Sequence, residues 1–217
     1  MKIALIGASG FVGSAILNEA LERGHEVTAI VRNPEKITVQ NTNLKAEKGD
    51  VFKKSEIAGL VKGSDIVISA YNPGWHSENI AQEIIEGSKA IQAEVKEAGV
   101  KRFITIGGAG SLEIAPGVQL VDTPEFPKEY KVAASAVRDY LADIKEEQDL
   151  DWTFFSPAIE MHQGISIGKT GKYRTGLDNP VFNENNRSIL SVEDLAVAIL
   201  DEAENPKHIK QRFTAAY

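Results

Sequence analysis

The feature that most constrains the fold lies at the start of the chain, where a short apolar run leads into three glycines. The run covers residues 2–6, and Gly7, Gly10 and Gly13 follow it at intervals of three. Apolar residues at helical spacing then continue to about residue 23. A strand, a tight glycine turn and a helix N-terminus, in this order, are typical of the site where an α/β protein holds the pyrophosphate of a dinucleotide.

Each glycine of this motif has a predicted role. Gly7 allows the sharp turn, Gly10 leaves room for a phosphate beside the backbone, and Gly13 lets the helix pack against the sheet. The spacing is G-x-x-G-x-x-G rather than the commoner G-x-G-x-x-G, and the alternative is a purely structural turn between strand and helix. The free N–H groups and the dipole of the first helical turn favour a bound phosphate. We expect cofactor contacts from Gly7, Ala8, Ser9, Gly10, Phe11, Val12 and Gly13.

The end of the second apolar run, residues 27–31, indicates the type of dinucleotide. NAD-specific enzymes place Asp or Glu about 20 residues after the glycine motif, where the carboxylate accepts from the ribose 2′-hydroxyl. Here Arg32 stands 19 residues after Gly13. A guanidinium suits a 2′-phosphate and cannot accept a hydrogen bond. We therefore expect NADP(H) in preference to NAD(H), the alternative being a solvated loop arginine.

Composition narrows the class of protein. The 217 residues, 42% hydrophobic and 25% charged, suit one globular domain. The absence of cysteine excludes disulfides and thiolate chemistry, and no His, Asp and Glu set has metal-ligand spacing. A formal charge of −7 without a basic patch argues against nucleic acid as a partner. The apolar runs are too short for a membrane span, and the first strand begins at residue 2, so we expect no signal peptide and a cytoplasmic location.

Alternation of strand and helix patterns along the chain predicts an α/β fold with a doubly wound parallel sheet, the Rossmann fold. Residues 158–190 interrupt the alternation with glycines and polar segments, including a predicted hairpin around residues 171–174. We interpret 158–190 as a small C-terminal, substrate-side lobe within a single domain, 1–217. A last helix is predicted from Ser191, with Asp194 three residues on, to about residue 204. The expected strands are 3–6, 27–31, 44–47, 65–70, 103–106, 152–155 and 211–215, and the other helices are 11–23, 53–62, 77–98 and 127–148.

Several motifs together resemble the atypical short-chain dehydrogenases/reductases, in the NmrA-like and NADH-flavin-reductase-like branch. They are the glycine motif 7–13 and the segments 31–34, 49–51, 65–70, 150–153, 156–157 and 188–196, so that the resemblance covers nearly the whole chain. It implies a Rossmann fold with a bound nicotinamide dinucleotide. By this resemblance, Asp50 and Val51 contact the adenine, Ala70 and Tyr71 lie along the nicotinamide-side ribose, and Gly107 and Pro157 border the nicotinamide. Asp50 is equally well explained as a turn residue.

The catalytic pair of this family, Tyr-x-x-x-Lys, is incomplete. Tyr130 stands at the start of the appropriate helix, but the residue four positions on is Ala134. The lysine lowers the pKa of the tyrosine, so the usual proton relay does not carry over. Ser111, after the fifth strand, is a second candidate for contact with a substrate carbonyl, or else a loop hydroxyl. His76 and His162 could reach the substrate side, whereas His25 and His208 are expected to be solvated.

Three functions remain open at this stage. The first is an NAD(P)H-dependent oxidoreductase that transfers hydride to a small conjugated acceptor such as FMN or another flavin, a quinone or a related carbonyl. Its expected acceptor walls are Tyr71, Trp75, Met161 and Tyr173. The alternatives are a non-catalytic NADP(H)-binding redox sensor of NmrA type and an NAD-dependent epimerase/dehydratase. The expected partner is a small-molecule substrate, and the protein is either a monomer or a homodimer.

Overall fold

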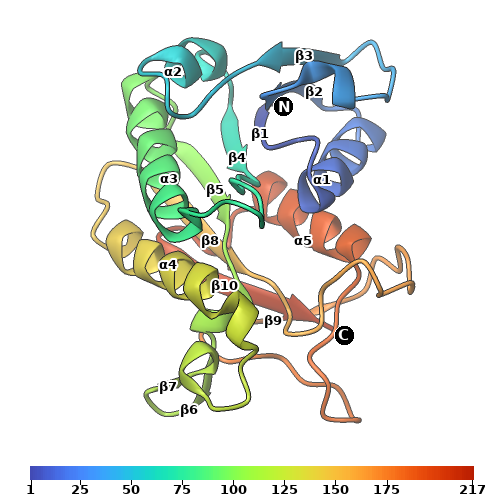
Figure 1. Ribbon diagram of the computed structural model, residues 1–217. Coiled ribbons are helices and arrows are strands. Elements are labelled where there is room, and N and C mark those ends of the chain that lie inside the picture. The colour runs from blue at the N-terminus through green and yellow to red at the C-terminus, as the bar shows by residue number, and fades with distance from the viewer.

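An eight-stranded sheet runs through the centre of the structure, with helices on both faces (Figure 1). The computed structural model describes residues 1–217. The strand order is β3-β2-β1-β4-β5-β8-β10-β9, and every neighbouring pair is parallel except β10 with β9. The predicted doubly wound Rossmann fold is therefore confirmed. The strands are β1 Lys2–Ile6, β2 Glu26–Val31, β3 Leu44–Lys48, β4 Ile66–Ser69, β5 Arg102–Ile106, β8 Asp151–Ser156, β9 Arg174–Gly176 and β10 Gln211–Ala216.

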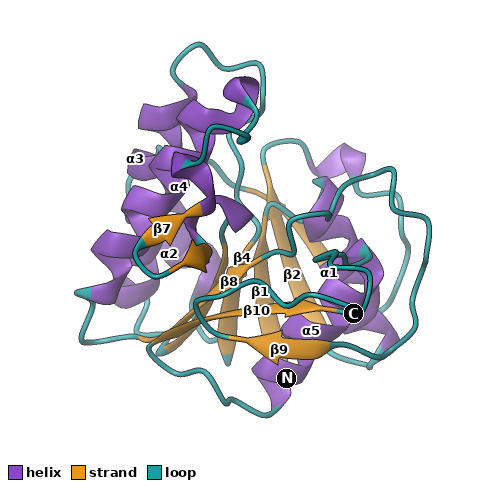
Figure 2. Ribbon diagram, turned by 90° about the horizontal axis from the view of Figure 1, so that it is seen from below, coloured by secondary structure: helices purple, strands orange, loops and turns teal.

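Helices cover the sheet in two groups, which Figure 2 shows on opposite sides of it. On one face α1 packs against α5, and on the other α3 lies beside α2 and α4. Residues alternate between the faces along β1: Ile3 and Leu5 belong to the core under α1 and α5, whereas Ala4 and Ile6 belong to the core on the other side. Burial on both sides explains why these strands are continuous apolar runs. The helices are α1 Phe11–Glu22, α2 Glu56–Val61, α3 Ile80–Glu97, α4 Lys128–Lys145 and α5 Val192–Glu204.

The strand order reverses between β1 and β4, and this reversal places the candidate site. From β1 the chain proceeds outward to β2 and β3, and then returns to β4 and continues the other way. The connections after β1 and β4 therefore leave in opposite directions, the arrangement that in open α/β sheets leaves a crevice at the carboxyl ends of the strands. Ligands of open α/β sheets bind in such a crevice.

The part of the chain after β8 departs from the sequence-based expectation. Residues 171–174 form no hairpin. Instead, β9 pairs antiparallel with the distant β10, and Thr214 stands opposite Gly176. The predicted last strand is present as β10, which lies between β8 and β9 and is buried from Arg212 to Ala216. A two-stranded hairpin, β6 Glu113–Ala115 and β7 Val118–Gln119, was not predicted. No helix combines the length and the apolar character that a membrane span needs.

The start of α5 is an anchoring point for the chain around it. Ser191 caps the helix by accepting a hydrogen bond from the backbone N–H of Asp194, as predicted. The fully buried carboxylate of Asp194 accepts from the Thr170 hydroxyl at 2.6 Å, the Gly171 N–H at 2.7 Å and the Tyr217 hydroxyl at 2.6 Å. One side chain therefore ties the loop before β9 and the end of β10 to α5.

Two histidines that were expected to be solvated are paired with carboxylates in partly buried contacts. His25 lies 2.8 Å from a carboxylate oxygen of Glu204, and His208 lies 2.8 Å from one of Glu202. The His208 ring also stacks on Phe213, with ring centroids 4.4 Å apart. The prediction was wrong because the carboxylate partners lie on α5, far from His25 in the sequence.

Replacing Asp194 tests this anchoring point. Asp194→Asn should lower the free energy of unfolding by about 2–4 kcal/mol, because hydrogen bonds to a charged acceptor contribute about 1.5–3 kcal/mol each and the amide cannot accept all of them. Glu193→Gln, an exposed change in the same helical turn, should stay within about 0.5 kcal/mol of wild type. Urea unfolding at neutral pH measures both values.

The difference in stability between wild type and Asp194→Asn should also depend on pH. Burial raises the pKa of Asp194, but hydrogen bonds from Thr170, Tyr217 and Gly171 outweigh it and hold the pKa below its usual value of 3.8. A lowered native pKa adds stability that is complete above the unfolded value and is lost as pH falls through the native value. The stability difference between wild type and Asp194→Asn should therefore be constant above about pH 5 and shrink below about pH 4. A constant difference down to about pH 2 would contradict this account.

Candidate functional site

Three segments meet at the glycine turn with no room for side chains between them. Gly7 has φ of +79°, and a Cβ atom on it would lie 2.5 Å from the carbonyl oxygen of Ala70, directly after β4. A Cβ atom on Gly13 would lie 2.1 Å from the carbonyl oxygen of Gly7. The end of β1, the first turn of α1 and the end of β4 are therefore held in backbone contact. The predicted role of Gly13 becomes more specific, since it packs the helix against the turn itself.

Gly10 differs from the other two glycines because its open side faces away from the protein. It is exposed, its dihedral angles are ordinary, and a Cβ atom on it would meet only the Gly7 carbonyl oxygen, at 3.4 Å. The backbone N–H groups of Phe11 and Val12, beside it, donate to no backbone or side-chain acceptor. The first turn of α1 contains no acidic residue. These groups fit a bound phosphate.

The remaining residues of the motif divide between core and surface. Ala8 is 1% exposed and packs in the core under α1, so only its backbone can face a ligand. Ser9 is exposed, and Phe11 and Val12 are half-buried. The structure thus brings all seven predicted residues to one turn, where backbone rather than side chains presents the binding groups.

Arg32 lies at the adjacent end of β2 and reaches across the crevice. Its side chain is exposed, and its Nη2 donates to the carbonyl oxygen of Pro73 at 3.2 Å. Pro73 belongs to the connection between β4 and α3, so Arg32 links the two sides of the strand-order reversal. Sequence spacing gave the position of Arg32 but gave no signal for this partner.

Asp50 and Val51 follow β3, beside Arg32. The Gly49 N–H donates to the carbonyl oxygen of Val31 at 3.0 Å and so joins the ends of β2 and β3. One carboxylate oxygen of Asp50 accepts from the Phe52 N–H at 3.1 Å, which is the turn role considered for it. Val51 is 8% exposed and packs in the core, so little of its side chain is open to a ligand.

The Tyr71 side chain is half-buried and packs against α3. Its hydroxyl donates to the carbonyl oxygen of Glu83 in α3 at 3.1 Å, and its ring lies so close to Gly87 that a Cβ atom there would be 2.5 Å from the hydroxyl. Burial and the nearby Glu83 carboxylate raise the pKa of Tyr71 to about 12. The backbone of Ala70 and Tyr71 lies beside Gly7, while the Tyr71 ring packs on Gly87 of α3 and leaves only part of its surface accessible.

Tyr173, another expected wall, is half-buried and packs against α5. Its hydroxyl donates to a carboxylate oxygen of Asp201 in α5, and its ring packs against the core under α1 and α5. Met161, half-buried, packs against the same core. Of the four expected walls, Trp75 alone is exposed, at 60%.

Gly107 and Pro157 come together at the ends of neighbouring strands. The Gly107 N–H donates to the carbonyl oxygen of Phe155 at 2.8 Å. A Cβ atom on Gly107 would lie 2.0 Å from the ring of Phe154, so any larger residue would displace that ring. Pro157 is buried directly after β8. These two residues therefore lie side by side at the carboxyl ends of β5 and β8.

The two candidate catalytic residues lie in different surroundings. Ser111 is 2% exposed, and both its hydroxyl and its carbonyl oxygen accept from the buried guanidinium of Arg212, at 3.2 and 2.8 Å. The Ser111 hydroxyl is therefore engaged inside the protein rather than facing the crevice. Tyr130 is 49% exposed at the start of α4, with its ring 5.4 Å from that of Trp75.

The position of the missing lysine is occupied by helix packing. A Cβ atom on Gly110 would lie 3.1 Å from the Cβ of Ala134 and 3.3 Å from that of Val121. The helix α4 therefore packs on the turn at residues 109–111 through Ala134. This small side chain stands one helical turn from Tyr130, where the family pattern has a lysine. The other side chains considered, His76 and His162, are both exposed.

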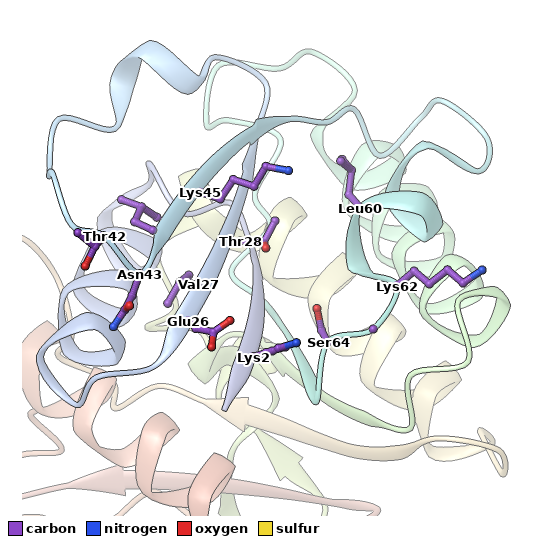
Figure 3. Close-up of a pocket in the computed structure, with 12 residues that line it drawn as sticks. Lys2, Glu26, Val27, Thr28, Thr42, Asn43, Lys45, Leu60, Lys62 and Ser64 are labelled. Carbon is purple, nitrogen blue, oxygen red and sulfur yellow. The ribbon is translucent and has the colours of Figure 1, made fainter.

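A separate hollow of about 470 Å³ lies at the amino-terminal ends of the strands, opposite the glycine turn (Figure 3). Lys2, Glu26, Lys45, Lys62 and Ser64 are among its lining residues, and they stand near the amino-terminal ends of β1 and β2 or on neighbouring segments. This hollow is therefore remote from the glycine turn at the carboxyl ends. No group of three or more His, Cys, Asp or Glu residues could hold a metal ion.

Comparison with known proteins finds a family and a set of similar structures. The model of a family described as NAD(P)H-binding matches residues 7–206. YwnB, an uncharacterised protein of Bacillus subtilis, is 42% identical over 216 residues, which cover 99% of this chain and 97% of the relative.

Two crystal structures illustrate the similarity of fold. A candidate epimerase from Bacteroides thetaiotaomicron is 48% identical, with a TM-score of 0.92 over 100% of this chain and 96% of the other. A candidate NADH-flavin reductase from Streptococcus pneumoniae is 36% identical, with a TM-score of 0.84 over 100% of this chain and 99% of the other.

The space above Gly10 provides a test of the site. Gly10→Val should weaken NADP⁺ binding by more than about 100-fold, because the side chain displaces a phosphate that would receive two or more charge-assisted hydrogen bonds. The protein should still fold, losing only about 1 kcal/mol through the poorer helix cap. Asn18→Val, at an exposed position two turns further along α1, is the matched control. Calorimetric titration and thermal melting separate the two effects, and near-native affinity in Gly10→Val would make the turn purely structural.

Proposed function

Since the chain belongs to the NAD(P)H-binding family, we propose that it is an NADPH-dependent reductase of a small conjugated acceptor, such as a flavin, a quinone or a related carbonyl. A reduced nicotinamide dinucleotide supplies a hydride when bound. The similarity to a candidate NADH-flavin reductase supports this reaction class. The similarity to a candidate epimerase keeps the epimerase alternative in view.

The chain's own residues would act mainly by binding and positioning. The N–H groups of Phe11 and Val12 would hold the pyrophosphate, with Gly10 leaving the space for it. Gly107 and Pro157 would present a flat border to the nicotinamide, because neither projects a polar side chain there. Holding two reactants in contact lowers the barrier without any proton transfer by the protein.

The observation that carries the choice of reaction is the contact between Ala134 and Gly110. It fills the position at which the related dehydrogenases place the lysine that activates their tyrosine. An alcohol or sugar substrate needs that proton relay. Hydride transfer to a flavin or quinone needs less acid assistance from the enzyme, so a reductase of such acceptors is the activity that these residues support best.

NADPH consumption with a panel of acceptors tests the proposal. Purified protein with NADPH should reduce at least one of riboflavin, FMN and menadione above the background rate. Binding of NADP(H) without turnover across the panel would overturn the reductase and favour a redox sensor, which the absent lysine also suits. Conversion of a nucleotide sugar would instead support the epimerase.

Arg32 provides the test of cofactor preference. If its guanidinium binds the 2′-phosphate, Arg32→Ala should weaken NADPH binding by roughly 10- to 150-fold, because a charge-assisted hydrogen bond contributes about 1.5–3 kcal/mol. NADH binding should change little, and added salt should reduce the effect.

Lys36→Ala, another exposed cation shortly after β2, is the matched control and should bind both cofactors as wild type does. Because Arg32 also donates to the Pro73 carbonyl, equal losses for NADPH and NADH would assign it a structural role. No loss for either cofactor would remove the reason for preferring NADP(H).

A further inference from the structure

Two large aromatic side chains meet on the outside of the molecule at the carboxyl end of the sheet. Trp75, in the connection between β4 and α3, is 60% exposed, and Tyr130, in the first turn of α4, is 49% exposed. Their ring centroids lie 5.4 Å apart with the ring planes at 74°, which is an edge-to-face contact. Because both side chains are largely exposed, burial in the core does not explain why the two rings lie together.

The helical spacing of α4 places Tyr130 over the end of β5. Ala134 and Val137, four and seven residues after it, share its helix face, and they pack on Gly110 and Gly108. Tyr130 continues that face by one turn. The loop of residues 107–110 follows β5, and Trp75 follows β4, so the pair stands over the β4–β5 side of the crevice.

That side is the one where an acceptor would meet the nicotinamide. Arg32 and Asp50 occupy the β2–β3 side, which leaves the nicotinamide half of a dinucleotide to the side of Ala70, Gly107 and Pro157. Tyr71 and Tyr173, the other aromatic residues considered for the acceptor, are half-buried, and their hydroxyls donate to Glu83 and Asp201. Trp75 and Tyr130 are thus the most exposed of the aromatic side chains considered there.

We propose that Trp75 and Tyr130 form a stacking platform that selects planar aromatic acceptors, which names the acceptor class within the reductase function proposed above and rests on it. The pair contacts the acceptor through its ring faces, which an edge-to-face arrangement leaves partly open. Tyr130 then acts through its ring, not as a proton donor. Its exposed position and the absence of a lysine one turn away agree with this role.

Direct binding tests the platform independently of turnover. Riboflavin is titrated calorimetrically into the protein with and without NADP⁺, and cyclohex-2-enone serves as a conjugated acceptor with no aromatic ring. Trp75→Ala and Tyr130→Ala should each weaken riboflavin binding about tenfold, equivalent to about 1.4 kcal/mol. Tyr130→Phe and Trp75→Phe should stay within about threefold of wild type, since they keep a ring.

Val132→Ala is the matched control, because Val132 is 60% exposed on α4 two residues after Tyr130 and so lies on another face of the helix. It should bind riboflavin as wild type does. None of the variants should change the dissociation constant of NADP⁺ or the binding of cyclohex-2-enone. Thermal melting of each variant checks that the fold is retained.

The outcomes separate this inference from the reductase proposal. Riboflavin binding that depends on both rings, without NADPH oxidation, would support the platform and overturn the reductase. Turnover with riboflavin whose KM is unchanged in Trp75→Ala would support the reductase and overturn the platform. A fall in the turnover rate of Tyr130→Phe by a factor of roughly 10² to 10⁴ would also overturn the platform, because losses of that size are typical of a removed general acid. Failure of wild-type protein to bind riboflavin would overturn it as well.

Discussion

Backbone contact at the glycine turn is the constraint on which the rest of the structure depends. The Gly7 carbonyl leaves no room for a side chain on Gly13, and the Ala70 carbonyl leaves none on Gly7. Because three segments meet there without side chains, the N-terminus of α1 is held over the point where the strand order reverses. Gly10 is left with its open side toward solvent. The site is therefore built from backbone N–H groups, and substitutions at its glycines separate folding from binding.

The connection between β4 and α3 joins the two halves of the crevice. Arg32 holds it at Pro73 on the side assigned to the 2′-phosphate, and Tyr130 meets it at Trp75 on the side assigned to the acceptor. These contacts lie two residues apart along one loop. The loop that would border the cofactor thus also carries a proposed specificity residue, so variants in it should be checked for both cofactor and acceptor binding.

Buried charges fix the C-terminal part of the chain. Asp194 holds the loop before β9 and the end of β10, while Arg212 joins Ser111 to Asp178 across the β10 side of the sheet. Such groups are costly to bury unless they are fully paired, so each one specifies a single arrangement of segments that lack regular structure. This explains how residues 158–190 are ordered with only the short strand β9.

The sequence by itself determined the fold class, the strands and helices up to β8 apart from the hairpin β6–β7, and the glycine turn, because apolar periodicity and glycine spacing are local properties of the chain. The capping of α5 by Ser191 was predictable for the same reason. Tertiary structure alone decided the direction of the Tyr71 and Tyr173 rings, the burial of Ser111 against Arg212 and the meeting of Trp75 with Tyr130. The hydrogen bonds among them join residues that are 12 to 101 positions apart in the sequence. The ring pair joins the connection after β4 to the helix α4. Only the packed sheet brings such residues together, and no local pattern in the chain records that.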